Sequence, residues 1–143
     1  MSAKIFPTAQ DAENAFYEAL ERCDLEAMMA VWSEDDDIVC VHPAGQRLAG
    51  QEQVREVWRQ MFAGGPNMRV QIAQQVVIAG MMLAVHSVRE NITVAGEQRP
   101  RPPMVATNVY LRTAAGWRMI VHHASPAQAQ APEAAPAEPK ILH

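Results

Sequence analysis

Histidine is the residue type in this chain that most favours chemistry, because imidazole titrates near neutral pH and exchanges protons readily. His42 precedes Pro43 at the end of a short, β-branched apolar segment. On strand alternation it shares a face with Ile38 and Cys40, so a buried Ile38 and Cys40 would turn His42 inward as well. We therefore expect His42 to line a pocket and to be the candidate general base there. The alternative is a histidine that hydrogen-bonds a loop backbone and shapes the turn.

A second pair of histidines, His122 and His123, lies in the last apolar segment. Neighbours on a strand point to opposite faces, so only one of them can join His42. The residue types do not decide which one does, and His123 is our candidate lining residue. Two or three histidines near a cysteine would suit a metal ion, but none of them has a ligand partner at helical spacing. We expect no metal and no cofactor, and we expect His86 on the outer face or at an interface.

Helical patterns are confined to the first half of the chain. Thr8 is a good N-cap, and apolar residues recurring at three- and four-residue intervals predict an amphipathic helix over residues 9–22. Asp24 is the N-cap of a short second helix. A third helix is expected from about Gly50 to the Gly-Gly-Pro breaker that begins at Gly64.

Strand signals fill the rest of the chain. Expected strands cover residues 38–42, 68–79, 82–94, 104–113 and 117–124. The last four follow one another through turns, as in a meander. Helices grouped before an antiparallel meander indicate an α+β domain in which the helices cover one face of a curved sheet.

This element order resembles the nuclear transport factor 2-like superfamily over roughly residues 8–125. Two segments are similar to its SnoaL-like branch: DLEAMMAVWSEDDDIVCVHPAGQRLAGQEQVREVW and ATNVYLRTAAGWRMIVHHASP. The resemblance implies three helices packed on a curved, mainly antiparallel sheet, which together form a cone around an internal pocket. Proteins of this fold include isomerases, dehydratases, cyclases, epoxide hydrolases and non-catalytic binding or assembly domains.

The resemblance also implies a set of site residues. In relatives similar to ketosteroid isomerase, the general base is an Asp before the Pro at the end of the first strand, and His42 has that position here. The first-helix Tyr that donates to the oxyanion falls on Phe16, and Tyr17 is expected to point about 100° away. The protonated acid falls near Asn108. These departures argue against steroid isomerisation and leave His42 and Asn108 as the candidate catalytic residues, a base and an orienting amide.

The rest of the pocket wall is expected to be apolar, and nine methionines suit an adaptable cavity. Candidate lining residues are Phe16, Trp32, Cys40, Trp58, Phe62, Met104 and His123. One of the strand neighbours Arg89 and Glu90 is expected to be buried and paired across a dimer.

The first functional hypothesis is a small-molecule-binding protein with proton transfer of isomerase, dehydratase or cyclase type. The second is a non-catalytic ligand-sensing or oligomerisation domain.

Composition narrows the classes further. The chain has 143 residues with a net charge of -4, which fits one domain and argues against nucleic-acid binding through bulk charge. No segment is long enough to span a membrane, the start shows no signal peptide, and two cysteines suggest thiols in a cytoplasmic protein. We expect a cone domain over 1–125 and a flexible Pro- and Ala-rich tail over 126–143. The expected partners are a small apolar or amphipathic molecule and, through an uncovered sheet face, a second copy of the chain.

Overall fold

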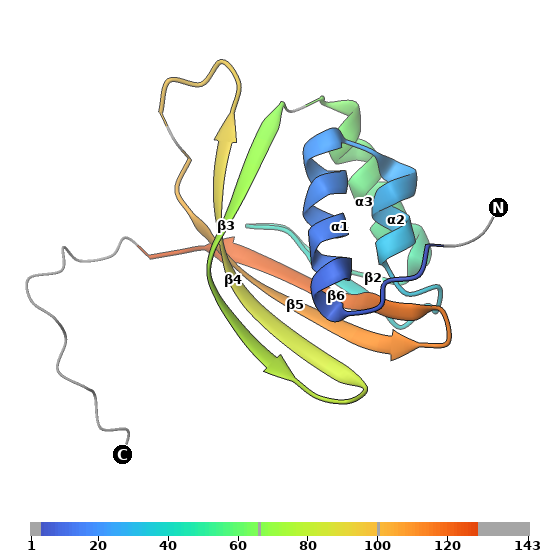
Figure 1. Cartoon of the computed structure of the whole chain (residues 1–143). Coiled ribbons are helices and arrows are strands. Elements are labelled where there is room, and N and C mark those ends of the chain that lie inside the picture. The colour runs from blue at the N-terminus through green and yellow to red at the C-terminus, as the bar shows by residue number, and fades with distance from the viewer. Residues whose placement is uncertain (1–3, 66, 100, 129–143) are drawn as a thin grey trace, which may run out of the picture.

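A computed structural model describes residues 4–65, 67–99 and 101–128 of the chain (Figure 1). Its helices are α1 (Ala9–Arg22), α2 (Leu25–Val31) and α3 (Gln51–Ala63). Its strands are β1 (Val39–Val41), β2 (Arg47–Ala49), β3 (Met68–Ala79), β4 (Leu83–Val94), β5 (Met104–Thr113) and β6 (Gly116–Pro126). The expected helices and strands are confirmed to within one or two residues at each end, and the short β2 is the one element that the sequence did not predict.

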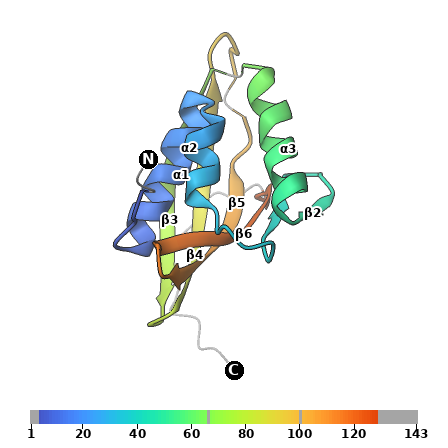
Figure 2. The ribbon, with the colours of Figure 1, turned by 90° about the vertical axis from the view of Figure 1, so that its right-hand side faces the viewer.

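The strands form one sheet in the order β2-β1-β6-β5-β4-β3. All neighbouring pairs are antiparallel except β1 and β6, which run parallel. The sheet curves around the helices, with α1 and α2 side by side and α3 apart from them toward β2 (Figures 1 and 2). This is the expected α+β cone, in which a mainly antiparallel sheet is covered by helices on its concave face.

The helix ends follow from local side-chain chemistry. The Thr8 side chain accepts a hydrogen bond from the Asp11 backbone N–H at 3.0 Å, and Asp24 caps α2 in the same way through Ala27. The start of α3 is different, because Gly50 has no side chain and a φ of 87°. Asp36, in the segment between α2 and β1, instead accepts from the first N–H of α3 at 2.9 Å and so positions the start of this helix.

Helix α1 buries a broad face against the sheet. Ala12, Glu13, Phe16, Tyr17 and Leu20 are all buried. Tyr17, which leaves the helix about 100° from Phe16, is buried as well, because a helix lying against a concave sheet is covered on more than one side. A charged residue, Glu13, therefore lies within the apolar stripe of the helix.

Two β-bulges change which side chains face the helices. In β3 the pairing with β4 shifts between Ala73 and Val76, where Gln74 has a φ of 50°. In β6 the pairing with β5 skips Ile120. Strand alternation from the buried Met119 would turn His123 inward, but this bulge shifts the phase by one residue.

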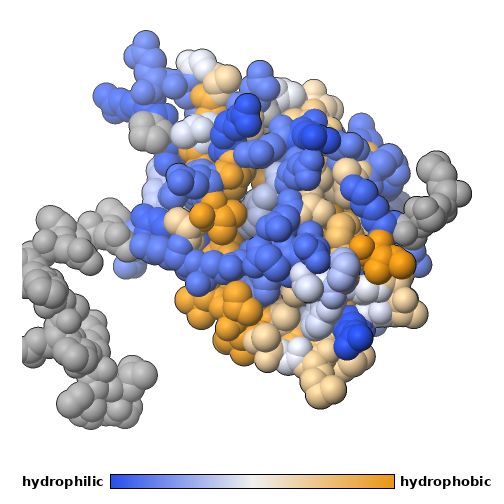
Figure 3. Space-filling model, viewed as in Figure 1, coloured by the Kyte–Doolittle hydropathy of each residue, from blue (hydrophilic) through white to orange (hydrophobic). Residues whose placement is uncertain are grey.

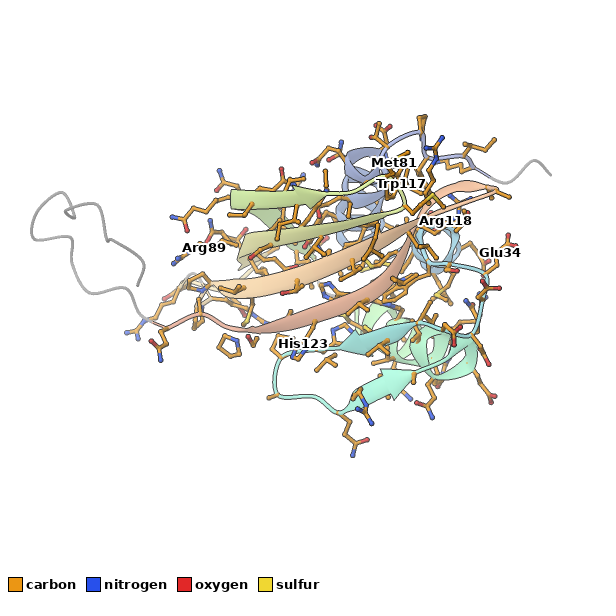
Figure 4. The ribbon with its side chains drawn as sticks, turned by 90° about the horizontal axis from the view of Figure 1, so that it is seen from below. Glu34, Met81, Arg89, Trp117, Arg118 and His123 are labelled. Carbon is orange, nitrogen blue, oxygen red and sulfur yellow. The ribbon has the colours of Figure 1, made fainter. Side chains whose placement is uncertain are left out.

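The shift in β6 decides between the paired histidines. His122 is buried at 3% exposure, whereas His123 is exposed. Figure 4, in which the sheet lies in front of the helices, shows His123 on the near side of β6. The expectation that His123 lines the pocket is therefore wrong, and His122 takes that place.

The last described residues extend the sheet a little further than expected. Strand β6 runs two residues beyond the expected end, and the Ala127 backbone N–H donates to Pro103 at 2.9 Å. Most of the predicted tail, residues 129–143, lies outside the described residues. In the described part of the chain, no helix is both long enough and apolar enough to cross a membrane.

Candidate functional site

A set of polar side chains is buried between α1 and the concave face of the sheet. It consists of Glu13, Tyr17, His86, Glu90, Asn108, Tyr110 and His122, none of which is more than 6% exposed. We call this set the polar network. The members from β4, β5 and β6 are aligned by the sheet register, since His86 lies opposite Asn108 and Asn108 lies opposite His122.

Glu13 is the acceptor at one end of the polar network. Its Oε2 accepts hydrogen bonds from Tyr110 Oη at 2.8 Å, His86 Nδ1 at 3.0 Å and Asn108 Nδ2 at 3.3 Å. Its Oε1 accepts from Gln75, which the β3 bulge presents to it. A buried carboxylate surrounded by donors is a stable arrangement. The expectation that His86 lies on the outer face is wrong, because Glu13 gives its ring a buried partner.

Glu90 lies at the pocket end of the polar network. Tyr17 Oη donates to Glu90 Oε2 at 2.6 Å and accepts from Asn108 Nδ2 at 3.0 Å. Burial, assisted by the nearby Glu13, raises the pKa of Glu90, and burial beside Glu90 raises the pKa of Tyr17. Of Arg89 and Glu90, the buried one is thus Glu90, but its partner is Tyr17 of the same chain rather than a residue across a dimer.

His122 connects the polar network to the pocket. Its Nδ1 lies 2.6 Å from Asn108 Oδ1, and its ring packs against Phe16 with the ring centroids 4.8 Å apart. Burial lowers the pKa of His122 to about 3, with the neighbouring His42 and His123 adding to the effect. The imidazole of His122 is therefore neutral at pH 7.

His42 lies on the same wall of the pocket. Ile38 and Cys40 are buried, and His42 shares their face as the sequence predicted. Its ring meets the Trp58 ring edge-on at a centroid distance of 4.6 Å, and its Nε2 lies 3.6 Å from Cys40 Sγ. Burial lowers the pKa of His42, so this ring too is neutral at pH 7, and burial raises the pKa of Cys40 to about 12.

These groups meet at a pocket of about 560 Å³ between α3 and the ends of β4, β5 and β6. Its protonatable lining groups are His42, Glu90 and His122, and Gln60 and Arg101 also contribute to the wall. The apolar part of the wall is formed by Leu20, Pro43, Val57, Trp58, Met61, Met68, Ile92, Met104 and Ala124. A mostly apolar cavity with a few convergent polar groups is typical of a small-molecule site.

The expected lining residues divide into two groups. Trp58 and Met104 line the pocket, and Phe62 packs on Trp58 with ring centroids 5.7 Å apart. Behind this wall, Phe16, Trp32 and Cys40 are fully buried in the core.

Asn108, a candidate catalytic residue, is also fully buried and is connected to the pocket through His122 and, by way of Tyr17, through Glu90. The sequence interpretation did not assign Glu13 or the Tyr17–Glu90 pair to the site. A signal for Glu13 was present, because it follows Ala9 and precedes Tyr17 by one helical turn each.

Histidines and a cysteine near one another are possible metal ligands. Across residues 4–65, 67–99 and 101–128, no three His, Cys, Asp or Glu side chains come together as a group that could hold a metal ion. The buried histidines are instead used in hydrogen bonds to Asn108 and Glu13 and in the contact with Cys40.

Comparison with protein families gives a match over most of the chain. Residues 10–129 match the model of the SnoaL-like domain. The F-box protein SKIP8 of Arabidopsis thaliana is 25% identical over 112 residues, which is 77% of this chain and 46% of SKIP8. The chain thus spans about half the length of that curated relative.

Solved structures agree with this match. A protein from Thiobacillus denitrificans, provisionally named a calcium/calmodulin-dependent protein kinase type II association domain, is 44% identical, with a TM-score of 0.82 over 87% of this chain and 99% of that one. A protein from Streptomyces avermitilis, provisionally named a dehydratase from the NTF2-like family, is 32% identical, with a TM-score of 0.75 over 82% and 92%. A cystatin-like protein of unknown function from Nostoc punctiforme shares the fold at 14% identity and a TM-score of 0.70, over 87% and 96%.

Proposed function

The chain belongs to the SnoaL-like domain family, and we propose that it binds a small apolar or amphipathic molecule in the pocket beside α3 and transfers a proton on it. The observation that carries this proposal is the placing of His42, Glu90 and His122 on the wall of one apolar cavity. Perturbed protonatable groups that converge on a cleft are typical of acid–base sites.

The protonation states suit proton transfer from carbon. At pH 7 both histidines are neutral, so an imidazole is available to accept a proton. Burial raises the pKa of Glu90, so its protonated form, which can donate a hydrogen bond to an oxygen that gains charge, persists to a higher pH than in an exposed glutamate. One imidazole would take a proton from a carbon beside a carbonyl, and the imidazolium would return it to the same or another carbon. Removal of the proton is the step that isomerase, dehydratase and cyclase reactions share, whereas its return to carbon completes an isomerisation.

Hydrogen–deuterium exchange provides a test that needs no knowledge of the natural substrate. We would incubate the protein with 1-tetralone, an apolar bicyclic ketone, in D2O and follow loss of the proton signal beside the carbonyl by NMR. We expect exchange faster than in buffer alone. Met61→Glu places a charge in the pocket wall and should abolish the acceleration. Met81→Glu makes the same change at a site that is 85% exposed and outside this pocket, and it should retain the acceleration.

The exchange experiment has clear contrary outcomes. Exchange no faster than in buffer would remove the proposed proton transfer. Equal exchange by the Met61→Glu and Met81→Glu proteins would show that any acceleration arises outside this pocket. In that case the second candidate function would stand alone.

The second candidate is an association domain, and a specific surface favours it. The end of the β3–β4 hairpin exposes large apolar side chains: Val76, Val77, Ile78, Met81, Met82 and Leu83. We call these residues the hairpin patch. Apolar residues gather along the lower edge of the molecule in Figure 3, where Figure 1 shows this hairpin. Such a surface supports a homodimer, and the Thiobacillus denitrificans relative is named as an association domain.

A cytoplasmic location belongs to the same proposal. Cys40 is fully buried as a thiol against His42, which fits a reducing compartment.

A further inference from the structure

The ring nitrogen that His122 offers to the pocket is determined by Asn108. One edge of the Asn108 amide lies 3.3 Å from Glu13 Oε2 and 3.0 Å from Tyr17 Oη. Glu13 Oε2 already accepts from Tyr110 and His86, and Tyr17 Oη donates its proton to Glu90. Both atoms can only accept from Asn108, so this edge must be the NH2 group.

The other edge of Asn108 is then the carbonyl. Its Oδ1 lies 2.6 Å from His122 Nδ1, and a carbonyl oxygen can only accept. His122 Nδ1 therefore carries the single proton of the neutral ring, and Nε2 keeps its lone pair. Because His122 lines the pocket and Nδ1 is used behind the wall, Nε2 is the nitrogen available to a ligand.

His42 presents a hydrogen-bond donor to the pocket, where His122 presents an acceptor. The buried Cys40 thiol keeps its proton at neutral pH, since burial raises its pKa to about 12. We infer that this thiol is the donor in its contact with His42 Nε2, which lies 3.6 Å from the sulfur. The neutral His42 ring then carries its own proton on Nδ1 and presents an N–H donor.

We propose that the pocket selects a neutral, mainly apolar molecule that carries a hydrogen-bond donor beside an acceptor on one edge, as in a lactam or cyclic imide. The donor would bind His122 Nε2 and the acceptor would bind His42 Nδ1–H. The two rings line the same pocket with centroids 6.2 Å apart, and about 560 Å³ accommodates a bicyclic molecule. This inference rests on the proposed small-molecule site and names its ligand class.

The inference assigns distinct roles to the residues behind the wall. Glu13 and Tyr17 act as positioning residues, because they fix the Asn108 amide and through it the His122 proton. Cys40 does the same for His42. On this inference the free lone pair that faces the pocket belongs to His122, so the base would be His122 in place of the expected His42.

The proton positions can be measured without any ligand. In protein labelled with nitrogen-15, two-bond proton–nitrogen correlation spectra distinguish the two neutral forms of each histidine ring. His42→Asn and His122→Asn variants would assign the signals. We expect the proton of His122 on Nδ1 and that of His42 on Nδ1, with His42 Nε2 facing Cys40. A proton on Nε2 of either ring overturns the inference.

Binding of three matched probes then tests the ligand class. The probes are 2-quinolinone, coumarin, in which a ring oxygen replaces the N–H, and naphthalene. Ligand-observed NMR gives their dissociation constants. Coumarin sets an oxygen lone pair against His122 Nε2, so we expect 2-quinolinone to bind about 10- to 100-fold more tightly than coumarin. Naphthalene should bind more weakly than 2-quinolinone.

A pair of neighbouring variants sharpens the probe experiment. His122→Leu should bring the ratio of the two dissociation constants close to one, whereas His123→Leu, at the exposed neighbour, should leave the ratio unchanged. Equal binding of all three probes to the native protein would overturn the donor–acceptor inference and leave the proposed apolar pocket intact. No binding of any probe would overturn both.

Discussion

The polar network and the hairpin patch are carried by the same strands and distribute their side chains in opposite ways. Within the concave face, β4 buries His86 and Glu90 together with the apolar Ala84 and Val88. At the free end of the hairpin, β3 exposes Val76, Val77 and Ile78 in succession. Polar groups are inside and apolar groups outside, which is the reverse of the usual distribution.

The difference shows which of the two regions has all its interaction partners within a single chain. The polar network has its partners: every member is hydrogen-bonded to another member, and Gln75 adds the last donor to Glu13. The hairpin patch has apolar surface on consecutive residues, so both faces of the ribbon are exposed. A chemical function is therefore best sought at the network, and an association function at the hairpin.

The largest effect is expected from removing the acceptor of the polar network. Glu13→Leu leaves the donors of His86, Asn108 and Tyr110 buried without their carboxylate. We expect a loss of about 3–5 kcal/mol in the free energy of unfolding, measured by urea denaturation at pH 7.

A surface variant of the same helix controls for this loss. Glu18→Gln affects an exposed ion pair with Arg22 and should change stability by no more than about 0.5 kcal/mol. Similar losses of stability from the two substitutions would contradict the view that the buried polar network stabilises the fold.

The second effect concerns the hairpin patch. Ile78→Lys combined with Met82→Lys places two charges on the proposed interface. We expect a dimer of the native protein at micromolar concentration by light scattering. The double variant should have a dissociation constant raised about 100-fold, because each buried apolar side chain contributes roughly 1.5–3 kcal/mol. A native protein that is monomeric under these conditions would contradict the association function.

The same comparison explains what the sequence could and could not predict. Helix α1 follows directly from the Thr8 cap and the apolar spacing, and the strands follow from β-branched runs between turn residues. The buried face of β4 is harder to predict, because Arg89 lies in one alternation phase and Glu90 in the other. Neither phase is purely apolar, so hydrophobic periodicity cannot choose between them.

Several site residues could not be predicted because their positions depend on strand register and on contacts between distant parts of the chain. The Ile120 bulge exchanges His123 for His122, and nothing in the local residue types marks it. The pairing of Tyr17 with Glu90 joins residues 73 positions apart. His42, in contrast, was placed by simple alternation from Ile38 and Cys40, because β1 is regular.

A smaller effect is expected from the pH dependence of His122. Its pKa falls from 6.5 to about 3 on folding, so the unfolded chain binds the extra proton first as the pH drops. The contribution of this group to stability is complete above pH 6.5 and is lost progressively toward pH 3. The lowered pKa of His42 acts in the same direction. The raised pKa of Glu90 acts in the opposite direction, since it removes stability as the pH rises through its titration.

A variant isolates the His122 contribution. His122→Asn keeps a donor for Asn108 but cannot titrate. Between pH 7 and pH 5 the native protein should lose about 2 kcal/mol more than this variant in urea denaturation, from 1.36 kcal/mol for each pH unit below the unfolded pKa. Equal losses would mean that folding leaves the pKa of His122 near its ordinary value of 6.5, so that the folded protein takes up this proton within the same pH range.

The smallest effect on stability is expected at the pocket rim. His42→Ala removes a partly buried ring that packs on Trp58 and faces the Cys40 thiol. The cost should not exceed about 1–2 kcal/mol, because water from the open pocket can fill the space and reach the thiol. The same variant should weaken 2-quinolinone binding about tenfold, through loss of the Nδ1–H donor. His42→Ala would thus weaken binding with little loss of stability, whereas Glu13→Leu would lower both. If His42→Ala instead unfolds the protein as readily as Glu13→Leu while 2-quinolinone binding by the folded fraction is unchanged, His42 belongs to the packing core, and the donor side of the pocket has to be sought on Glu90.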